Sequence, residues 1–413
     1  MHGLIFVAIA GLAIVFASGS AQAQCGGPCL YENMTPDMGR SAAGAGARAQ
    51  DSSTAFWNPA GMTELGDGTE VMLGLGAAFS ELNPKLDAGT VTPNPPVVSG
   101  SNAGGFAPLF GSYLSTKLPY DIHFGMAVTT LYGGAVDYNQ NWTGRTQVTD
   151  ASMFSLLIQP SFAYAVTDWL SLGAGPTVLY TVFDQRLKAS DAALAPTVKI
   201  SNAEDWSAGG AFSALVKPRG GTRIGLYYRT EIVSKTKGNI EGPLGLSPAF
   251  DGKFTFPQGV NVSLFQQLCE EWAILADAGW TDWSKFGNIP LSVGPLGATG
   301  HLDWNDTWRT AIGFQYVPSE KWTLQGGFGY DSSPVKASKL QPVLPTSEQY
   351  RFSAGILFRP QSYVEIALSY TFEWFGDMQI NDVALPPSNN VVLNGKFDPA
   401  YANIVGVNLK VKF

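Results

Sequence analysis

The feature that most constrains the fold is a period of two in the hydrophobic pattern, which recurs from about residue 69 to the C-terminus. From Val364 to Trp374 every even-numbered residue is apolar, whereas the odd-numbered residues are polar or small. Because successive side chains of a β-strand point to opposite faces, this segment is predicted to be a strand with one wholly apolar face. The same split occurs in 223–230, 308–316 and 321–331.

Fourteen such runs can be counted, and they are separated by turn residues. They span about 69–80, 106–118, 122–131, 152–166, 169–183, 205–217, 222–231, 252–268, 272–283, 306–317, 321–331, 350–359, 363–376 and 401–413. Most are longer than the roughly 5–6 residues of soluble strands and match tilted, membrane-crossing strands. The total is even, as in single-chain bacterial barrels. We therefore predict an all-β fold, a transmembrane antiparallel β-barrel of about 14 strands.

The connections between these runs alternate in length. Short turns are expected at 166–168, 318–320 and 359–361, and long loops at 81–105, 132–151, 184–204, 232–251, 284–305 and 377–400. Short connections at one end and long ones at the other are typical of a barrel with a periplasmic and an outer end.

Composition favours the barrel over a large soluble β-sandwich, the main alternative for alternating strands. Charged residues make up 14% of the chain, below the roughly 25% of soluble domains, and 11 Trp and 15 Tyr could supply two interfacial belts. After the N-terminal segment no apolar run approaches the length of a membrane-spanning helix. The net charge of −8 gives no reason to expect nucleic acid as a partner.

The first 23 residues are predicted to be a signal peptide. Residues 4–17 are apolar but too few to span a bilayer, and Ala21-Gln22-Ala23 has the small-x-small pattern of a cleavage site. No Lys or Arg precedes the apolar run, so a structured apolar N-terminus is the alternative. Whether Cys25 and Cys29 form a small periplasmic disulfide loop stays open. Cys269 is expected to be a small apolar residue.

The chain ends in an amphipathic strand whose last residue is Phe413. This resembles the C-terminal sorting signal that the barrel assembly machinery reads in outer-membrane barrels. An ordinary edge strand that happens to end on Phe is the alternative, but a free apolar edge invites aggregation and barrel closure removes it. The last strand therefore predicts a location in the outer membrane of a Gram-negative cell.

Residues 24–66 do not alternate and are rich in Gly, Ala and Ser. The glycine spacing in 39–46 is not that of a nucleotide-binding loop, because no strand precedes it and no Gly-Lys-Ser/Thr follows. Small residues suit a segment packed inside a lumen, and Asn58-Pro59 predicts a turn or break. We expect 24–66 to be a hatch that plugs the lumen and 67–413 to be the barrel.

The hatch also carries a specific resemblance. The run from Ala47-Arg48-Ala49-Gln50-Asp51 to Asn58-Pro59-Ala60-Gly61-Met62 resembles the hatch of the FadL family of outer-membrane transporters, whose motif Asn-Pro-Ala matches Asn58, Pro59 and Ala60. Further matches lie in 272–284, 329–335 and 351–355, so the resemblance covers essentially the whole mature chain. The Cys25/Cys29 pair departs from the family pattern.

This resemblance implies passive uptake of hydrophobic small molecules, long-chain fatty acids or aromatic hydrocarbons, through a hatch-gated barrel with a lateral exit. It places Phe56, Trp57, Asn58, Pro59 and Ala60 on the ligand path. The expected partners are the hydrophobic ligand, outer-membrane lipids, lipopolysaccharide and the barrel assembly machinery, with the protein acting as a monomer. A general aqueous porin or a structural outer-membrane barrel is the alternative.

Charged residues on the predicted lumen face are balanced in sign. They are Arg223, Arg229, Arg309 and Arg351 against Asp277, Asp331, Glu365 and Glu373. Since buried charges need partners, the plain interpretation is that they pair with one another and with the hatch. A role in gating is the sharper hypothesis, placed first on Asp331 and Arg351 and then on Arg309 and Glu365.

Catalytic chemistry finds little support in the sequence. His123 and His301 are the only histidines after the predicted signal peptide and stand apart, and no nucleophile elbow or zinc-ligand spacing occurs. Neither an enzyme activity nor a cofactor or metal is expected, and an outer-membrane enzyme is kept as an alternative of a different class.

Overall fold

The computed structural model of the chain describes residues 27, 31–190, 192, 195–242, 247–286, 288–293, 296–385 and 390–413. The predicted signal peptide, Cys25 and Cys29 lie outside the described residues. In these described ranges, no helix combines the length and the apolar character needed to cross a membrane.

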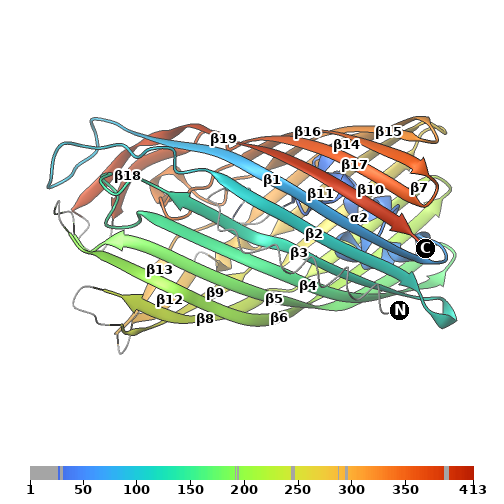
Figure 1. The fold of residues 1–413 in the computed structure, drawn as a ribbon, viewed down its shortest axis with the longest axis horizontal. Helices are drawn as coiled ribbons and strands as arrows, with labels where there is room; N and C mark the ends of the chain where they lie inside the picture. The colour runs from blue at the N-terminus through green and yellow to red at the C-terminus, as the bar shows by residue number, and fades with distance from the viewer. Residues whose placement is uncertain are drawn as a thin grey trace.

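One antiparallel sheet accounts for nearly all of the regular structure (Figure 1). Its strands are β1 Thr69–Leu86, β2 Phe106–Lys117, β3 Ile122–Asp137, β4 Asp150–Thr167, β5 Leu170–Lys188, β6 Thr197–Arg219, β7 Thr222–Arg229, β8 Ile232–Glu241, β9 Ala249–Phe256, β10 Gly259–Gln267, β11 Trp272–Thr281, β12 Asn288–Val293, β13 Leu296–His301, β14 Thr307–Ser319, β15 Trp322–Asp331, β16 Gln349–Gln361, β17 Val364–Trp374, β18 Gln379–Leu385 and β19 Val391–Lys412.

The sheet closes into a 14-stranded barrel, as predicted. The last strand, β19, pairs with β1 over a long register that includes Leu73 opposite Leu409 and Gly76 opposite Gly406. The backbone N–H of Phe413 donates to the Thr69 carbonyl oxygen at 2.8 Å, so the chain terminus itself belongs to this seam. Closure gives each of the fourteen crossing strands a neighbour on both sides, so none of them presents a free edge in the described part of the chain.

Five short strands, β8, β9, β12, β13 and β18, prolong the wall beyond the fourteen crossing positions. For example, β6 pairs with β7 and then with β8. The expectation of long loops at 232–251, 284–305 and 377–400 was therefore wrong for much of their length. Exposed Lys235 and Lys237 alternate with buried Ser234 and Thr236, so this part of the wall lacks the apolar outer face used to recognise strands.

Along the crossing strands the faces are sorted as the sequence predicts. In β17, Ile366, Leu368 and Trp374 are exposed, whereas Glu365 and Glu373 are buried in the lumen. Exposed aromatic residues form groups toward both ends of the wall: Trp272, Trp322 and Tyr363 beside the short turns, and Trp206, Trp308 and Trp374 toward the opposite end. An apolar band between aromatic girdles is the outer surface that a lipid bilayer requires.

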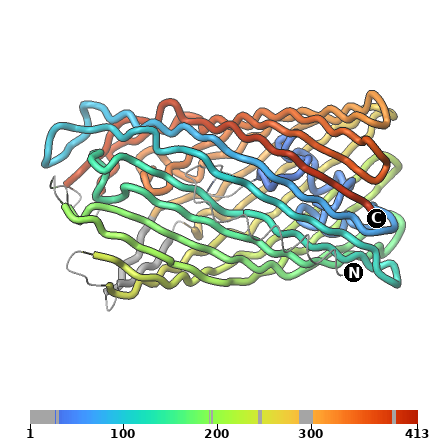
Figure 2. The backbone as a smooth tube through the Cα atoms, viewed as in Figure 1, coloured from blue at the N-terminus to red at the C-terminus, as the bar shows by residue number. Residues whose placement is uncertain are grey.

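The segment before β1 folds into short helical turns inside the barrel. They are η2 Pro36–Arg40, α2 Ala45–Arg48, α3 Thr54–Trp57 and η3 Pro59–Glu64. Single turns η4 Pro119–Asp121, η6 Trp283–Lys285 and η7 Ala337–Lys339 lie in connections of the barrel. Figures 1 and 2 show the N-terminal turns enclosed at the end of the barrel that holds the C-terminus, which is also the end with the short turns. Short turns mark the periplasmic end, so the hatch closes the periplasmic half.

The lipid-facing position of Leu409 can be tested with Leu409→Lys. Leu409 lies outward on β19, whereas its neighbour Asn408 is buried and donates to the Met34 carbonyl oxygen at 2.5 Å. A lysine on the lipid face costs about 2–4 kcal/mol at the bilayer midplane and about 0–1 kcal/mol near an interface, so the folded fraction in outer-membrane extracts should fall. Heat-modifiable gel mobility measures that fraction, with Leu409→Ile as the matched control. Equal folding of both variants would contradict the assignment of faces.

Candidate functional site

The hatch is held in shape by a buried charge network. The Arg48 Nε atom lies 2.8 Å from Asp37 Oδ1, and the same guanidinium pairs with Asp51; Arg40 also pairs with Asp37. Burial raises the pKa of the Asp51 carboxyl, but the nearby charges of Arg48 and Lys410 outweigh burial and lower it to about 2. The carboxylate therefore stays ionised at neutral pH, and buried charges paired in this way make separation of the turns costly.

The Asn58-Pro59-Ala60 motif faces the barrel wall. The Asn58 side-chain amide donates to the Gly46 carbonyl oxygen at 2.6 Å within the hatch and to the Ala214 carbonyl oxygen of β6 at 3.0 Å. The Ala60 backbone N–H donates to Ser213 Oγ at 2.9 Å. Asn58 is extended (φ −166°, ψ 89°), as a residue before proline prefers. Asn58 and Ala60 thus fix the hatch to β6.

Glycines of the wall make room for the hatch backbone. A Cβ added to Gly173 would overlap the Ala60 backbone, and one added to Gly225 would overlap the Gly46 carbonyl. The same holds for Gly74 against Met34, Gly111 against Asn33 and Gly327 against Arg40. Sequence reasoning did not single out these glycines, because a glycine in a strand signals a close backbone approach without naming the partner.

Phe56 and Trp57 lie on another side of the hatch, where they line a cavity of about 100 Å³. The Trp57 ring stacks on Tyr31 with centroids 6.4 Å apart and meets Phe56 edge-on at 4.9 Å. The wall of the cavity comes from β3, β7, β10, β11 and β14, with Leu131, Tyr132, Tyr227, Arg229, Gly259, Asn261, Asp277, Gly279 and Arg309 among the lining residues.

Two guanidinium groups line this apolar cavity. Arg229 Cζ lies 5.4 Å from the Phe56 ring centroid, and its Nε donates to the Tyr227 hydroxyl at 3.1 Å. No ion pair found among the described residues involves Arg229. Arg309 Cζ lies 3.8 Å from the Tyr31 ring centroid, and Arg309 Nη1 lies 3.5 Å from Asp331 Oδ2. The cavity therefore offers both apolar surface and positive charge.

Behind Tyr31 lies the group that includes three of the four gating candidates. The Arg351 guanidinium is fully buried and pairs with Asp331, with Glu373 at 2.6 Å and with Glu32 at 3.3 Å. Arg309 shares Asp331 with it. The structure thus brings Asp331, Arg351 and Arg309 together. The contact with Glu32 was missed, because nothing in the local pattern points to it.

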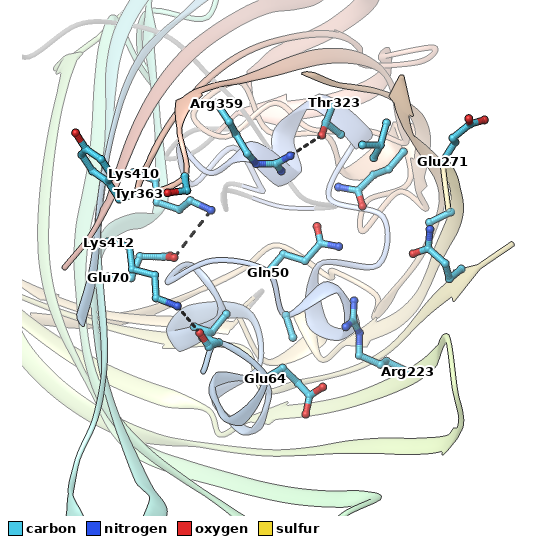
Figure 3. A pocket seen from close by; sticks show the side chains of 17 residues that line it. Gln50, Glu64, Glu70, Arg223, Glu271, Thr323, Arg359, Tyr363, Lys410 and Lys412 are labelled. Atoms are coloured by element: carbon cyan, nitrogen blue, oxygen red, sulfur yellow. Dashed lines mark hydrogen bonds and ion pairs between the residues drawn. The ribbon is translucent and has the colours of Figure 1, made fainter. Parts of the chain in front are cut away.

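Glu365, the fourth gating candidate, lies elsewhere. It pairs with Arg359 at 2.6 Å and with Lys410 at 3.5 Å, at the short-turn end. Its two partners border a polar chamber of about 510 Å³, in which Gln50 of the hatch lies amid Glu70, Arg223, Arg359 and Lys410 (Figure 3).

The lumen on the other side of the hatch is apolar. Two clusters of buried side chains extend from the long-loop end to the hatch. One includes Phe375, Ile380, Leu393 and Phe397 and reaches Met34 and Met38; the other includes Phe250, Phe254, Phe256, Trp283 and Phe286 and reaches Phe56 and Tyr31. The hatch therefore separates an apolar outer lumen from a polar periplasmic chamber.

A break in the wall lies beside the hatch strap formed by residues 31–33. The β2–β3 ladder ends at Gly111 and Thr129, and β3 carries a register shift between Thr130 and Gly133. Asn33 Nδ2 donates to the Thr130 carbonyl oxygen at 2.8 Å, and the Tyr113 hydroxyl of β2 donates to the Asn33 carbonyl oxygen. Asn33 thus connects the two strands where their own pairing ends.

A closed barrel with a lipid-facing outer surface, an internal hatch and an apolar outer lumen defines a plugged outer-membrane transport barrel. The chain belongs to the outer membrane protein transport protein family (OMPP1/FadL/TodX), whose model matches residues 16–413.

Individual relatives agree with this membership. The chain is 25% identical to the long-chain fatty acid transport protein of Salmonella typhi, over 87% of this chain and 90% of that protein. The crystal structure of a Pseudomonas aeruginosa FadL homologue superposes with a TM-score of 0.85 at 20% identity, over 94% of this chain and 100% of that one. The Ralstonia pickettii toluene transporter TbuX gives 0.67 at 16% identity, over 93% and 100%.

The close approach of Gly46 in the hatch to Gly225 in the wall predicts that Gly225→Ala destabilises the closed hatch. The new methyl group has to displace Gly46, and overpacking of this kind costs about 1–3 kcal/mol. The closed position of the hatch should become less stable by about this amount. Ion conductance in planar bilayers should therefore rise while the barrel stays folded.

The matched control is Gly220→Ala in the β6–β7 turn, where an added Cβ meets nothing within 4 Å. Its conductance should equal that of the unchanged protein. Equal conductance of Gly225→Ala and Gly220→Ala would show that the hatch does not depend on this close approach.

Proposed function

We propose that the protein mediates passive uptake of amphipathic hydrophobic molecules across the outer membrane, with long-chain carboxylates as its favoured ligands. The observation that carries this proposal is the apolar outer lumen, which leads to a cavity with two guanidinium groups. An aqueous porin needs a polar, water-filled interior, which makes it a poorer fit. The similarity to a long-chain fatty acid transport protein of Salmonella typhi supports the same substrate class.

The cavity suits both parts of such a ligand. An acyl chain that leaves water for the apolar lumen gains about 0.8 kcal/mol for each methylene group that is buried. Phe56 and Trp57 offer aromatic surface to that chain. Arg229 can donate to the carboxylate, because no carboxylate of the described residues pairs with it. Aromatic hydrocarbons would use the same apolar surface without the charge.

In the proposed sequence, ligand enters at the long-loop end, reaches the cavity and leaves sideways between β2 and β3. Displacement of the strap around Asn33 would open that exit, while Asn58, Pro59 and Ala60 keep the rest of the hatch on the wall. Asp331, Arg309 and Arg351 would act in this displacement. Glu365 would have the separate role of fixing the periplasmic end through Lys410 and Arg359.

Assembly fits a single chain. Because β19 closes on β1, the sheet is complete without a partner subunit, and we propose a monomer. Phe413 ends the closing strand with a side chain that is 71% exposed, so it is accessible to the assembly machinery.

The headgroup assignment predicts that Arg229→Gln weakens carboxylate binding selectively. Loss of one hydrogen bond between charged partners costs about 1.5–3 kcal/mol, which corresponds to a roughly 10- to 150-fold higher Kd. Binding of decanoate and of uncharged decanol to protein in lipid nanodiscs would be compared by calorimetry. Decanol affinity should change little. Arg186→Gln, at an exposed arginine on β5 far from the cavity, is the control. A parallel loss for both ligands would reject the assignment.

The lateral exit predicts faster transfer in Asn33→Ala. The substitution removes the side-chain hydrogen bond to the Thr130 carbonyl oxygen, worth about 0.5–1.5 kcal/mol, so a labelled fatty acid should reach the bilayer of proteoliposomes roughly 2- to 10-fold faster. Gly111→Ala pushes on the same Asn33 carbonyl and should act in the same direction. Unchanged transfer in both variants, at equal protein incorporation, would exclude an exit closed by Asn33.

A further inference from the structure

Three consecutive residues of the hatch strap make three different kinds of contact. Tyr31 covers Arg309, with its ring 3.8 Å from the guanidinium carbon. Glu32 pairs with Arg351, and Asn33 connects β2 to β3. Because the three residues are adjacent, movement of one strains the contacts of the other two. The ion pair of Glu32 is therefore mechanically linked to the wall break.

The charges around Arg351 do not require Glu32. Arg309 and Arg351 make their ion pairs with Asp331 and Glu373 on the barrel wall, so these four ion-paired charges balance, two against two. Glu32 adds a third carboxylate, which makes the group net negative by one. A surplus buried charge is costly, so this carboxylate is the one most easily exchanged.

Of the three carboxylates that pair with Arg351, Glu32 also makes the longest ion pair. Its Oε1 lies 3.3 Å from Arg351 Nε, whereas Glu373 lies 2.6 Å from Arg351 Nη2. Glu32 Oε2 is buried without a hydrogen-bond partner in the described part of the chain. A buried acceptor without a partner costs about 1–3 kcal/mol, and this cost is recovered when the strap leaves.

We propose that Glu32 is an internal carboxylate that holds the closed hatch at the place a ligand carboxylate takes on opening. The proposal rests on the proposed function, since it assigns a sensor to the same ligand class. A carboxylate that Arg229 holds in the cavity passes to Arg309, displaces Tyr31 from it and then replaces Glu32 on Arg351. The strap leaves, Asn33 releases Thr130 and the wall break opens.

Such an exchange discriminates between ligands by charge. A ligand shifts a conformational equilibrium only by its difference in affinity for the two states. A ligand carboxylate competes with Glu32 for Arg351, whereas a neutral hydrocarbon or alcohol offers the guanidinium no charged acceptor. Uncharged ligands therefore bind in the cavity of the closed hatch, and carboxylates also open it.

The test is Glu32→Gln in the full mature chain in nanodiscs, titrated with decanoate and with decanol. The amide keeps the size of the side chain but removes its charge, so decanoate no longer competes with an internal carboxylate. If the closed strap is about 90% populated in the unchanged protein, decanoate should bind about tenfold more tightly and decanol equally well. Glu32→Asp keeps the charge and should stay near the unchanged protein. Glu320→Gln, in the exposed β14–β15 turn, is the matched control.

Two results would overturn the proposal: weaker or unchanged decanoate binding in Glu32→Gln, or an equal shift for decanoate and decanol. Glu32→Ala repeats the test with a smaller side chain, and heat-modifiable mobility establishes that each variant is folded. Failure of the proposed function looks different, because the unchanged protein would then bind neither ligand. If the unchanged protein binds both ligands but Glu32→Gln shows no selective gain for decanoate, the proposed function stands and the proposed role of Glu32 is rejected.

Discussion

The backbone hydrogen bonds between β1 and β19 are the interaction on which the other features depend. In a bilayer there is no water to satisfy a free strand edge, so a sheet can cross only when its first and last strands pair. The long register from Glu70–Lys412 to Leu86–Gly395 makes that pairing. It also brings Asn408 beside Met34, so the seam that closes the barrel contacts the hatch at the residue that follows the strap.

A closed barrel creates an interior that has to be filled, and this chain fills it in two ways. Toward the long-loop end the filling is apolar side chains from the wall and its extensions. Toward the periplasm it is the hatch, whose charges pair with one another and with the wall. The boundary between the two lies at Phe56, Trp57 and Tyr31, where an apolar path meets Arg229 and Arg309. An amphipathic ligand matches that boundary because it carries both chemistries.

The hatch is attached unevenly, and this sets where it can move. The Asn58-Pro59-Ala60 turn is bound by directed hydrogen bonds to β6 and packed against glycines that leave it no room. The strap at 31–33 makes a long ion pair, a few hydrogen bonds, the ring contacts of Tyr31 and one close approach of Asn33 to Gly111, at a place where the wall itself is not continuous. Motion at the strap therefore disturbs far less packing than motion of the whole plug.

The sequence by itself determined the barrel, its fourteen crossing strands, the outward and inward faces and the hatch with its Asn58-Pro59-Ala60 turn. All of these follow from local rules: side chains alternate along a strand, and proline restricts the residue before it. Only the tertiary structure decided that Glu32 meets Arg351, that Glu365 stands apart from Arg309, and that Gly225 receives Gly46. These pairs are separated by scores to hundreds of residues, and no periodicity records which distant strand the hatch touches. The extensions β8, β9 and β12 also required the structure, because a wall that faces water lacks the apolar outer face that identifies a strand in lipid.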